Sequence, residues 1–508
     1  MFLGNMVKKK TLVNNSISGV ILLVITALLT FLCIPVFINK LGTELYGVFA
    51  LVTVIGNLNI FTNIGLDAAL TKFITEQGQS EDSNKDIITS LLLSSSLVIL
   101  ISSLVFCFRF FLLREILHIP EMYVAQAENL MDLLLIANGI LLIGQTFTSM
   151  LHSLQRIYLS NILQLIYSSI YWIGTIIVVS MGYGLPAVGI MMLIAAIIWL
   201  LLSICYSILY WGNIGVDYSS NDFKKHANKQ IVFGLKVYTS GIISFFNEPL
   251  FKIIISHFFG MSVVAYYEIA IKVKNQINGI FHKMIIPLYP YISQLTDKNF
   301  IATLIKDLTK KIFLLTIPVC LMLLFTCHDI VTLWLQTNIT YYSYFIIGIA
   351  VPFLLFSPPT IPIYLFLLAK GHPEKTIVFQ SFTVIANMLL FISLYPFIGL
   401  YSILAANALE CLGSFLLGVY YQYKYQRITY RIPRITEVRR YAILLGVYLC
   451  IGGTGYFITN SYLALSYNIC LLLISTIYLY KYLSIIRKED VDRYFSENRF
   501  IVSLYNKL

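Results

Sequence analysis

The sequence predicts an all-α integral membrane protein with about 14 transmembrane helices, and three observations support this fold class. Of the 508 residues, 58% are hydrophobic and 12% are charged, and the mean hydropathy is +0.81. Apolar windows of spanning length recur along the chain, and short basic loops separate them. A soluble protein of this length does not need so much apolar sequence. The expected spans are 16–38, 46–70, 87–112, 124–150, 158–181, 186–211, 231–257, 262–290, 312–335, 343–369, 376–396, 400–423, 441–459 and 463–486.

The distribution of basic residues predicts the orientation of these spans. If both termini are cytoplasmic, the inside loops and tails hold about 27 of the 35 lysines and arginines, as expected for short cytoplasmic loops. The outside loops then hold only Lys40, Arg109 and Arg114. The net charge of +11 therefore indicates membrane topology rather than nucleic acid binding. Segment 427–440 is rich in arginine and is expected to contact anionic membrane lipids.

The sequence lacks the motifs of enzyme chemistry and metal binding. It contains no P-loop, no HExxH motif and no nucleophile elbow, and no segment outside the spans is long enough to build a catalytic domain. The eight cysteines are scattered singly, without a CxxC pair, and are interpreted as small buried residues. We therefore expect a transporter without catalytic residues, metal ligands or an organic cofactor.

The seventh and eighth spans carry charged residues at membrane depth. Glu248 and Lys252 lie four residues apart on the seventh span. Glu268 and Lys272 repeat this spacing on the eighth span, so each pair shares a helix face. If the chain folds back at Gly260, the inner residues of the two pairs lie level, roughly 12 Å from the turn, and the outer residues lie roughly 18 Å from it. A charge at this depth costs at least about 2.5–3.5 kcal/mol, so it needs a partner or a watery cavity.

Two interpretations of these charges remain open. In one, the lysines face a solvated lumen and bind an anionic substrate. In the other, ion pairs Lys252–Glu268 and Lys272–Glu248 cross the hairpin and set the helix register. Asn275 shares a face with Lys272, whereas Lys274 lies on another side of the helix. The predicted substrate-binding set comprises Lys252, Lys272, Lys274, Glu248, Glu268 and Asn275.

Four acidic residues are candidates for ion coupling, with H⁺ or Na⁺ as the coupling ion: Asp132, Glu128, Glu410 and Asp67. An acid at membrane depth can bind and release a proton as access alternates. Glu128 and Asp132 lie four residues apart on the fourth span, where hydrogen bonds to neighbouring helices are the alternative role. Asp67 lies near the end of the second span beside Lys72, where the alternative is an interfacial position.

An internal repeat at a spacing of about 218 residues indicates two lobes. Segments 37–49 (FINKLGTELYGVF) and 255–267 (ISHFFGMSVVAYY) both place a glycine at an outer turn before an aromatic helix entry. Six spans separate the two copies, so they share one orientation and imply an axis along the membrane normal. The predicted organisation is an N-terminal lobe 1–212, a cytoplasmic linker 213–230, a C-terminal lobe 231–424, two extra helices within 425–486 and a cytoplasmic tail 487–508.

The tenth span is expected to break at segment 357–362 (SPPTIP). Proline lacks a backbone N–H and clashes with the preceding helical turn. The carbonyl groups that it frees must be buried in protein or line a cavity. A hinge of a moving transporter and a tolerated kink are both compatible with this pattern.

Two groups of residues resemble a known family. Leu41-Gly42, Tyr46-Gly47-Val48-Phe49 and Ile64-Gly65-Leu66 with Ala68-Ala69-Leu70 and Lys72 are similar to the N-terminal signature of the polysaccharide flippases. These proteins belong to the multidrug/oligosaccharidyl-lipid/polysaccharide exporter superfamily. Tyr266-Tyr267, Ile269-Ala270 and Lys272, followed by Pro290 and Ser293, resemble the hairpin of that family's second half. The resemblance covers the whole chain and agrees with its span count.

This resemblance implies two lobes in a pseudo-two-fold V shape in a bacterial plasma (inner) membrane. It implies flipping of undecaprenyl-pyrophosphate-linked oligosaccharide units from the cytoplasmic to the outer leaflet by alternating access, for O-antigen, lipopolysaccharide or capsule synthesis. Polysaccharide polymerase or assembly proteins are the implied partners. The family's central cavity is positively charged, and Lys252, Lys272 and Lys274 match it here. Glu248 and Glu268 depart from the pattern because they lower the net positive charge of this region.

Three other functions compete with this interpretation. A lipid II flippase for cell-wall synthesis fits the same features. A multidrug or metabolite cation antiporter of the same superfamily usually has twelve spans and favours an acidic cavity over lysines. A membrane-embedded glycan polymerase or ligase usually has a sizeable outward loop, and the outside loops here are short.

Overall fold

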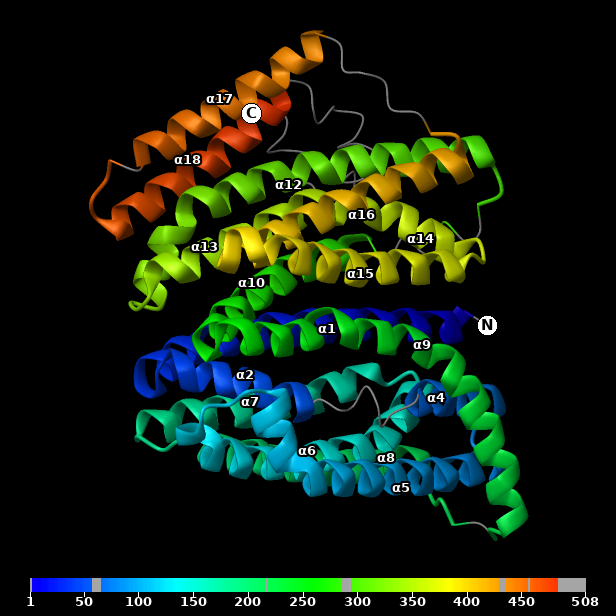
Figure 1. The fold of residues 1–508 in the computed structure, drawn as a ribbon. Coiled ribbons are helices and arrows are strands. Elements are labelled where there is room, and N and C mark those ends of the chain that lie inside the picture. The colour runs from blue at the N-terminus through cyan, green and yellow to red at the C-terminus, as the bar shows by residue number, and fades with distance from the viewer. Residues whose placement is uncertain are drawn as a thin grey trace. The chain divides into compact units, whose positions relative to one another are not determined.

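We describe a computed structural model of the chain over residues 2–56, 65–215, 217–285, 292, 295–428, 435–455 and 457–482. All regular secondary structure in these ranges is helical (Figure 1). By its internal contacts the chain divides into two compact units, residues 1–268 and 269–508. Ile64, Pro290, Ser293, residues 429–434 and the predicted tail 487–508 lie outside the described residues.

Within the described residues, each predicted span contains helical structure. The first unit contains α1 (Phe2–Leu41), α2 (Thr43–Gly56), α4 (Leu66–Gln77), α5 (Glu81–Phe111) extended by the π-helical turn η1 (Leu112–Ile116), α6 (Glu121–Ser153), α7 (Ile157–Ser180), α8 (Leu185–Trp211) and α9 (Ser220–Phe259). Helix α10 (Met261–Ile285) begins in the first unit and continues into the second. The second unit adds α12 (Lys298–Trp334), α13 (Ile339–Phe356), η2 (Pro358–Thr360), α14 (Ile361–Ala369), α15 (Pro373–Ile398), η3 (Gly399–Tyr401), α16 (Ser402–Gln426), α17 (Ile435–Gly455) and α18 (Ser461–Tyr482).

Among the described residues, eight helical segments are long and apolar enough to cross a membrane, judged by length and composition. Helix α2 and the apolar parts of α17 and α18 are shorter. The charged hairpin of α9 and α10 is not one of the eight segments. These findings confirm an all-helical, multi-pass membrane protein. The division by contacts assigns α9 to the first unit, and the predicted lobe boundaries at 212 and 231 stay a prediction.

The two turns of the predicted repeat have the same backbone geometry. Gly42 between α1 and α2 has φ +92°, and Gly260 between α9 and α10 has φ +79°. The Gly42 amide donates to the carbonyl of Ile38 at 2.9 Å, and the Gly260 amide donates to that of Ser256 at 3.1 Å. Only glycine adopts this positive-φ conformation without strain, which explains why both copies carry it.

The core of the first unit surrounds α6. In its apolar window 61% of the residues are buried, compared with 17% in α5, so α6 is much more enclosed by protein than α5. Helices α4, α5, α6 and α8 share one apolar cluster, which includes Leu70, Ile87, Phe147 and Trp211. In the second unit, Phe281 and Ile285 of α10 pack with residues of α12, α13 and α14.

The proline-rich segment interrupts the tenth span as predicted. Helix α13 ends at Phe356, the 3₁₀ turn η2 follows at Pro358–Thr360, and α14 begins at Ile361. The Thr360 amide and hydroxyl both donate to the Ser357 carbonyl, at 2.9 Å and 2.7 Å. The interruption is therefore a tight turn inside the second unit.

Candidate functional site

The predicted cross-hairpin contact between Lys252 and Glu268 is present in the first unit. The Lys252 ammonium on α9 forms an ion pair with the Glu268 carboxylate on α10, and the two side chains are only 12% and 10% exposed. The Tyr46 hydroxyl of α2 lies close enough to interact electrostatically with Glu268. Two opposite charges in so enclosed a place neutralise each other, which is the condition for burying either one. Whether the pair also meets a substrate stays a prediction.

The other predicted residues of the hairpin have different environments. Glu248 and Lys272 are half-buried, and each makes further interactions. Asn275 is exposed. The predicted pairing of Glu248 with Lys272 stays a prediction.

Lys274 and Glu410 come together inside the second unit, although the sequence assigned them to different roles. Lys274 on α10 is 6% exposed and Glu410 on α16 is 8% exposed, and the two interact electrostatically. The Lys274 ammonium also lies 4.7 Å from the centroid of the Phe353 ring on α13, within cation–π range. The Cys411 thiol donates to Glu410 Oε2 at 3.5 Å. A buried cation and a buried acid therefore share one environment.

Arg109 forms ion pairs with both predicted coupling acids of the fourth span. Its guanidinium bridges Glu128 at 2.7 Å and Asp132 at 2.8 Å. The sequence assignment of Arg109 to an outside loop is wrong, because Arg109 lies in the last turn of α5. There the α5–α6 hairpin places it beside the first turns of α6. Counting residues back from this hairpin turn is the signal that could have found the cluster. Its acids are already compensated, which favours the hydrogen-bonding alternative for them.

Asp67 lines a cavity of about 730 Å³ between α4 and the C-terminal half of α6. The α4 wall consists of Asp67, Ala68, Thr71, Lys72, Thr75 and Glu76, and the α6 wall of Gln145, Thr148, Ser149 and His152. All of these residues belong to the first unit, and only Ala68 lacks a polar side chain. Sequence reasoning singled out Asp67 alone. The i, i+4, i+8 spacing of Asp67, Thr71 and Thr75 is the pattern that marks one polar helix face.

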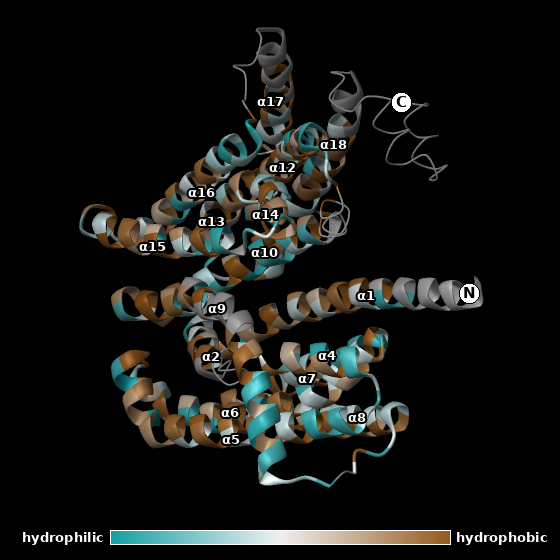
Figure 2. Ribbon diagram, turned by 90° about the vertical axis from the view of Figure 1, so that its right-hand side faces the viewer, coloured by the Kyte–Doolittle hydropathy of each residue, from teal (hydrophilic) through white to brown (hydrophobic). Residues whose placement is uncertain are grey.

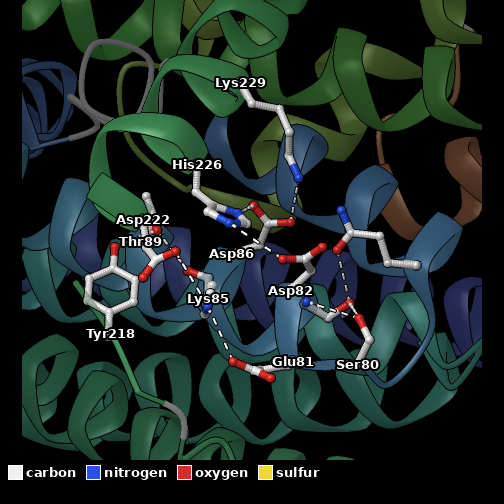
Figure 3. A network of polar contacts seen from close by, with 12 residues as sticks. Ser80, Glu81, Asp82, Lys85, Asp86, Thr89, Tyr218, Asp222, His226 and Lys229 are labelled. Atoms are coloured by element: carbon white, nitrogen blue, oxygen red, sulfur yellow. Dashed lines mark hydrogen bonds and ion pairs between the residues drawn. The ribbon is translucent and has the colours of Figure 1, made fainter. Parts of the chain in front are cut away.

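A buried polar network joins the start of α9 to α5 (Figure 3). The Asp86 carboxylate on α5 is fully buried. It contacts His226 Nδ1 at 2.7 Å and accepts hydrogen bonds from Lys229 Nζ at 2.7 Å and from Gln230 Nε2 at 3.2 Å. Gln230 also donates to the Asp86 carbonyl at 2.8 Å. The α9 segment that carries these residues is largely hydrophilic (Figure 2).

The start of α9 lies within the predicted linker 213–230, and the network was not predicted from the sequence. Helix α9 begins with a capping box in which Ser219 and Asp222 exchange hydrogen bonds. Hydrogen bonds from the hydroxyl and amide of Ser219, and the nearby Lys85 ammonium, lower the pKa of Asp222 to about 2. A carbon at the Cβ position of Gly65 would lie 2.5 Å from the Gly234 carbonyl oxygen, so α9 also packs on the backbone preceding α4.

The fold is that of solved membrane transporters. It superposes on a lipid II flippase, MurJ, in an inward closed conformation, with TM-score 0.71 and 16% identity over 91% of this chain and 99% of that chain. It also resembles an inward-facing multidrug resistance MATE transporter of the MOP superfamily, with TM-score 0.62 and 16% identity over 80% of this chain and 96% of that one. An outward-facing MATE structure gives TM-score 0.54 with 16% identity over 82% and 95%. The chain therefore has the fold of these membrane transporters.

The particular family follows from the sequence. Residues 12–296 match the family described as Polysaccharide biosynthesis protein, and the chain belongs to this family. No curated protein matches the sequence. The family match and the fold together confirm the resemblance to the polysaccharide flippases of the exporter superfamily.

Proposed function

We propose that this protein flips lipid-linked oligosaccharides, namely undecaprenyl-pyrophosphate-linked repeat units, from the cytoplasmic to the outer leaflet for O-antigen or capsule synthesis. The observation that carries the proposal is family membership over residues 12–296 combined with the lipid II flippase fold over 91% of the chain. Both termini are cytoplasmic in this proposal, because that orientation keeps the basic loops inside. Polymerase or assembly proteins would receive the flipped unit.

The buried lysines support an anionic substrate. Glu268 neutralises Lys252, and Glu410 interacts electrostatically with Lys274. An arriving pyrophosphate carries more negative charge than one carboxylate and replaces Glu268 as the partner of Lys252. Lys272, Asn275 and Glu248 are further proposed contacts of the substrate.

The environment of Glu410 supports a role in ion coupling. A proton on Glu410 removes its charge and leaves the Lys274 ammonium to attract the substrate. Release of that proton restores the competing carboxylate, so substrate and proton affinity are linked. Glu128 and Asp132 are weaker candidates because each already forms an ion pair with Arg109. Asp67 is exposed and lines the polar cavity instead.

Lipid II flipping is the second candidate, and the similarity to a lipid II flippase favours it. The MATE-like fold also fits a cation antiporter. The acids Glu268 and Glu410 already interact with lysines, so a cationic substrate would have to compete with those lysines for them, which weighs against this function.

Complementation distinguishes these functions. The gene is expressed in one strain that lacks its own O-antigen or capsule flippase and in another that is depleted of its lipid II flippase. Surface glycan is scored in the first strain and growth in the second. Restored glycan alone supports our proposal, restored growth alone supports lipid II, and restoration of neither trait overturns both.

Variants test the lysines in the same strain. Lys252→Ala and Lys272→Ala are compared with their arginine counterparts and with Lys298→Ala, an exposed position at the start of α12. We expect glycan to be lost in the alanine variants and kept in the arginine variants and the control, at equal membrane abundance. Glycan kept in all of them would assign these lysines a structural role.

A further inference from the structure

The cavity between α4 and α6 differs in chemistry from the buried lysines. Thr148 and Ser149 on its α6 side are 6% and 2% exposed, and the polar face of α4 forms the other side. Its volume of about 730 Å³ falls within the range of small-molecule sites, roughly 300–1,000 Å³. The cavity lies entirely within the first unit, so its geometry depends only on how α4 and α6 pack there.

Three hydroxyl groups in the cavity have already used their only proton. Thr75 Oγ1 donates to the Thr71 carbonyl at 2.6 Å, and Thr148 Oγ1 donates to the Gln145 carbonyl at 3.0 Å. Ser149 Oγ donates to the Asp67 carbonyl at 3.4 Å. A hydroxyl has one proton and two lone pairs, so these three groups remain as acceptors. The cavity therefore offers acceptors to a ligand that brings donors.

The charges of the cavity disfavour an anion. Asp67 and Glu76 contribute two carboxylates, whereas Lys72 contributes the only ammonium among the cavity's described residues. That ammonium is engaged, because it lies 3.9 Å from Glu76 and 4.4 Å from the centroid of the Phe233 ring of α9. A phosphate entering the cavity would meet an excess of negative charge.

The polar network of α9 holds Phe233 in place. Lys229, two turns into the docked segment, contacts the buried Asp86 and lies 4.3 Å from the Phe73 ring centroid on α4. Phe73 and Phe233 pack edge to face, with their centroids 5.7 Å apart. The network thus keeps the ring that engages Lys72 next to α4.

We propose that this cavity binds an uncharged, hydroxyl-rich sugar, whose hydroxyl groups donate to Thr75, Thr148, Ser149 and Asp67. The proposal rests on the proposed flippase function for the source of the sugar, which is the glycan part of the lipid-linked substrate. In this proposal the cavity binds the sugar, and other residues of the chain bind the phosphates of the same substrate. Under the proposed topology the cavity faces the cytoplasmic side, where the substrate is loaded.

Binding to the purified full-length protein in lipid nanodiscs tests the proposal. Saturation-transfer NMR is recorded with a panel of uncharged hexose and N-acetylhexosamine disaccharides, and inorganic pyrophosphate is added as competitor. We expect at least one disaccharide to bind, without displacement by pyrophosphate. Thr148→Val removes a hydroxyl acceptor at nearly constant shape and is expected to weaken this binding at least about fivefold, as is Asp67→Asn. Absence of binding by the whole panel, or displacement by pyrophosphate, overturns the proposal.

The matched control is Thr303→Val. The Thr303 hydroxyl donates to a backbone carbonyl of its own helix, that of Asn299, at 2.9 Å, and Thr303 does not line the cavity. It should leave sugar binding unchanged, and thermal unfolding of each variant confirms that it is folded. Equal weakening by Thr303→Val and Thr148→Val would contradict the cavity assignment.

Complementation separates this proposal from the flippase proposal. If the wild type restores surface glycan and Thr148→Val binds the sugar as well as the wild type does, the cavity proposal is wrong and the flippase proposal stands. If sugar binding depends on Thr148 but the protein complements no strain, the cavity proposal stands and the flippase proposal is wrong.

Discussion

Lys274 on α10 and Glu410 on α16 interact electrostatically inside the second unit, where their side chains are 6% and 8% exposed. This relationship connects a predicted substrate residue with a predicted coupling residue. Each charge would be costly to bury alone, and their proximity offsets that cost. The two residues should therefore be energetically coupled.

A double-mutant cycle measures this coupling. Glu410→Gln and Lys274→Met are each expected to lower the stability of the detergent-solubilised protein, because each leaves one buried charge without its neighbour. The double variant should be more stable than the sum of the two effects predicts, by about 0.5–3 kcal/mol. Thermal unfolding of the four proteins gives the value, and additive effects would show that the two residues act independently.

Ion coupling should depend on Glu410 more than on Asp132. In vesicles loaded with a lipid-linked oligosaccharide, Glu410→Gln is expected to reduce gradient-driven flipping at least about tenfold, because the amide cannot release a proton. The same vesicles with an uncoupler should give wild-type rates close to those of the variant. Asp132→Asn serves as the comparison, since Arg109 already compensates Asp132. A larger loss in Asp132→Asn would transfer the coupling role to the α6 acids.

The contact between α9 and α5 should depend on Asp86. In Asp86→Asn the Lys229 ammonium loses its anionic partner, and breaking a buried charge pair costs about 3–5 kcal/mol. We expect trypsin to cleave at the exposed Lys224 and Lys225 at least about tenfold faster than in the wild type, because local opening precedes cleavage. The neighbouring Asp82→Asn is the control, since the Asp82 side chain is 61% exposed. Unchanged cleavage in Asp86→Asn would contradict a stabilising network.

The start of α9 should also respond to acid through Asp222. Its folded pKa of about 2 lies below the ordinary value of 3.8, so the ionised form is favoured in the folded protein. The stabilising contribution is complete above pH 3.8 and is lost as the pH falls toward 2. Hydrogen exchange of residues 217–235 should therefore accelerate over this window. The Asp222→Ala variant lacks this carboxyl group, so its hydrogen exchange should not accelerate over this pH window. Identical pH profiles in the variant and the wild type would exclude a contribution of Asp222.

Close helix packing should depend on Gly47. A Cβ atom at Gly47 of α2 would lie 2.0 Å from the Met261 carbonyl oxygen at the start of α10, where the backbone cannot simply move aside. We expect Gly47→Ala to destabilise the protein by about 1–3 kcal/mol, as overpacking of a dense interior does. Gly446→Ala on α17 is the matched control, because nothing lies within 4 Å of its added carbon. Equal unfolding temperatures in both variants would contradict the contact.

The sequence by itself determined the features that depend on local pattern. Hydropathy windows located the helices because membrane spanning is a property of each segment. The repeat of Gly42 and Gly260 follows from the backbone requirement of two equivalent turns. Lys252 and Glu268 could be paired by counting residues from Gly260, because a hairpin of two helices makes depth a function of sequence position.

Only the tertiary structure decided which distant residues meet. His226 contacts Asp86 across 140 residues of sequence, and Lys229 contacts it across 143. Nothing in the local sequence pattern encodes such a pairing. The cavity of Thr148 and Asp67 likewise arises where two polar helix faces oppose each other. The physical reason is that periodicity identifies the polar face of a helix, whereas packing among many helices decides which face lies opposite it.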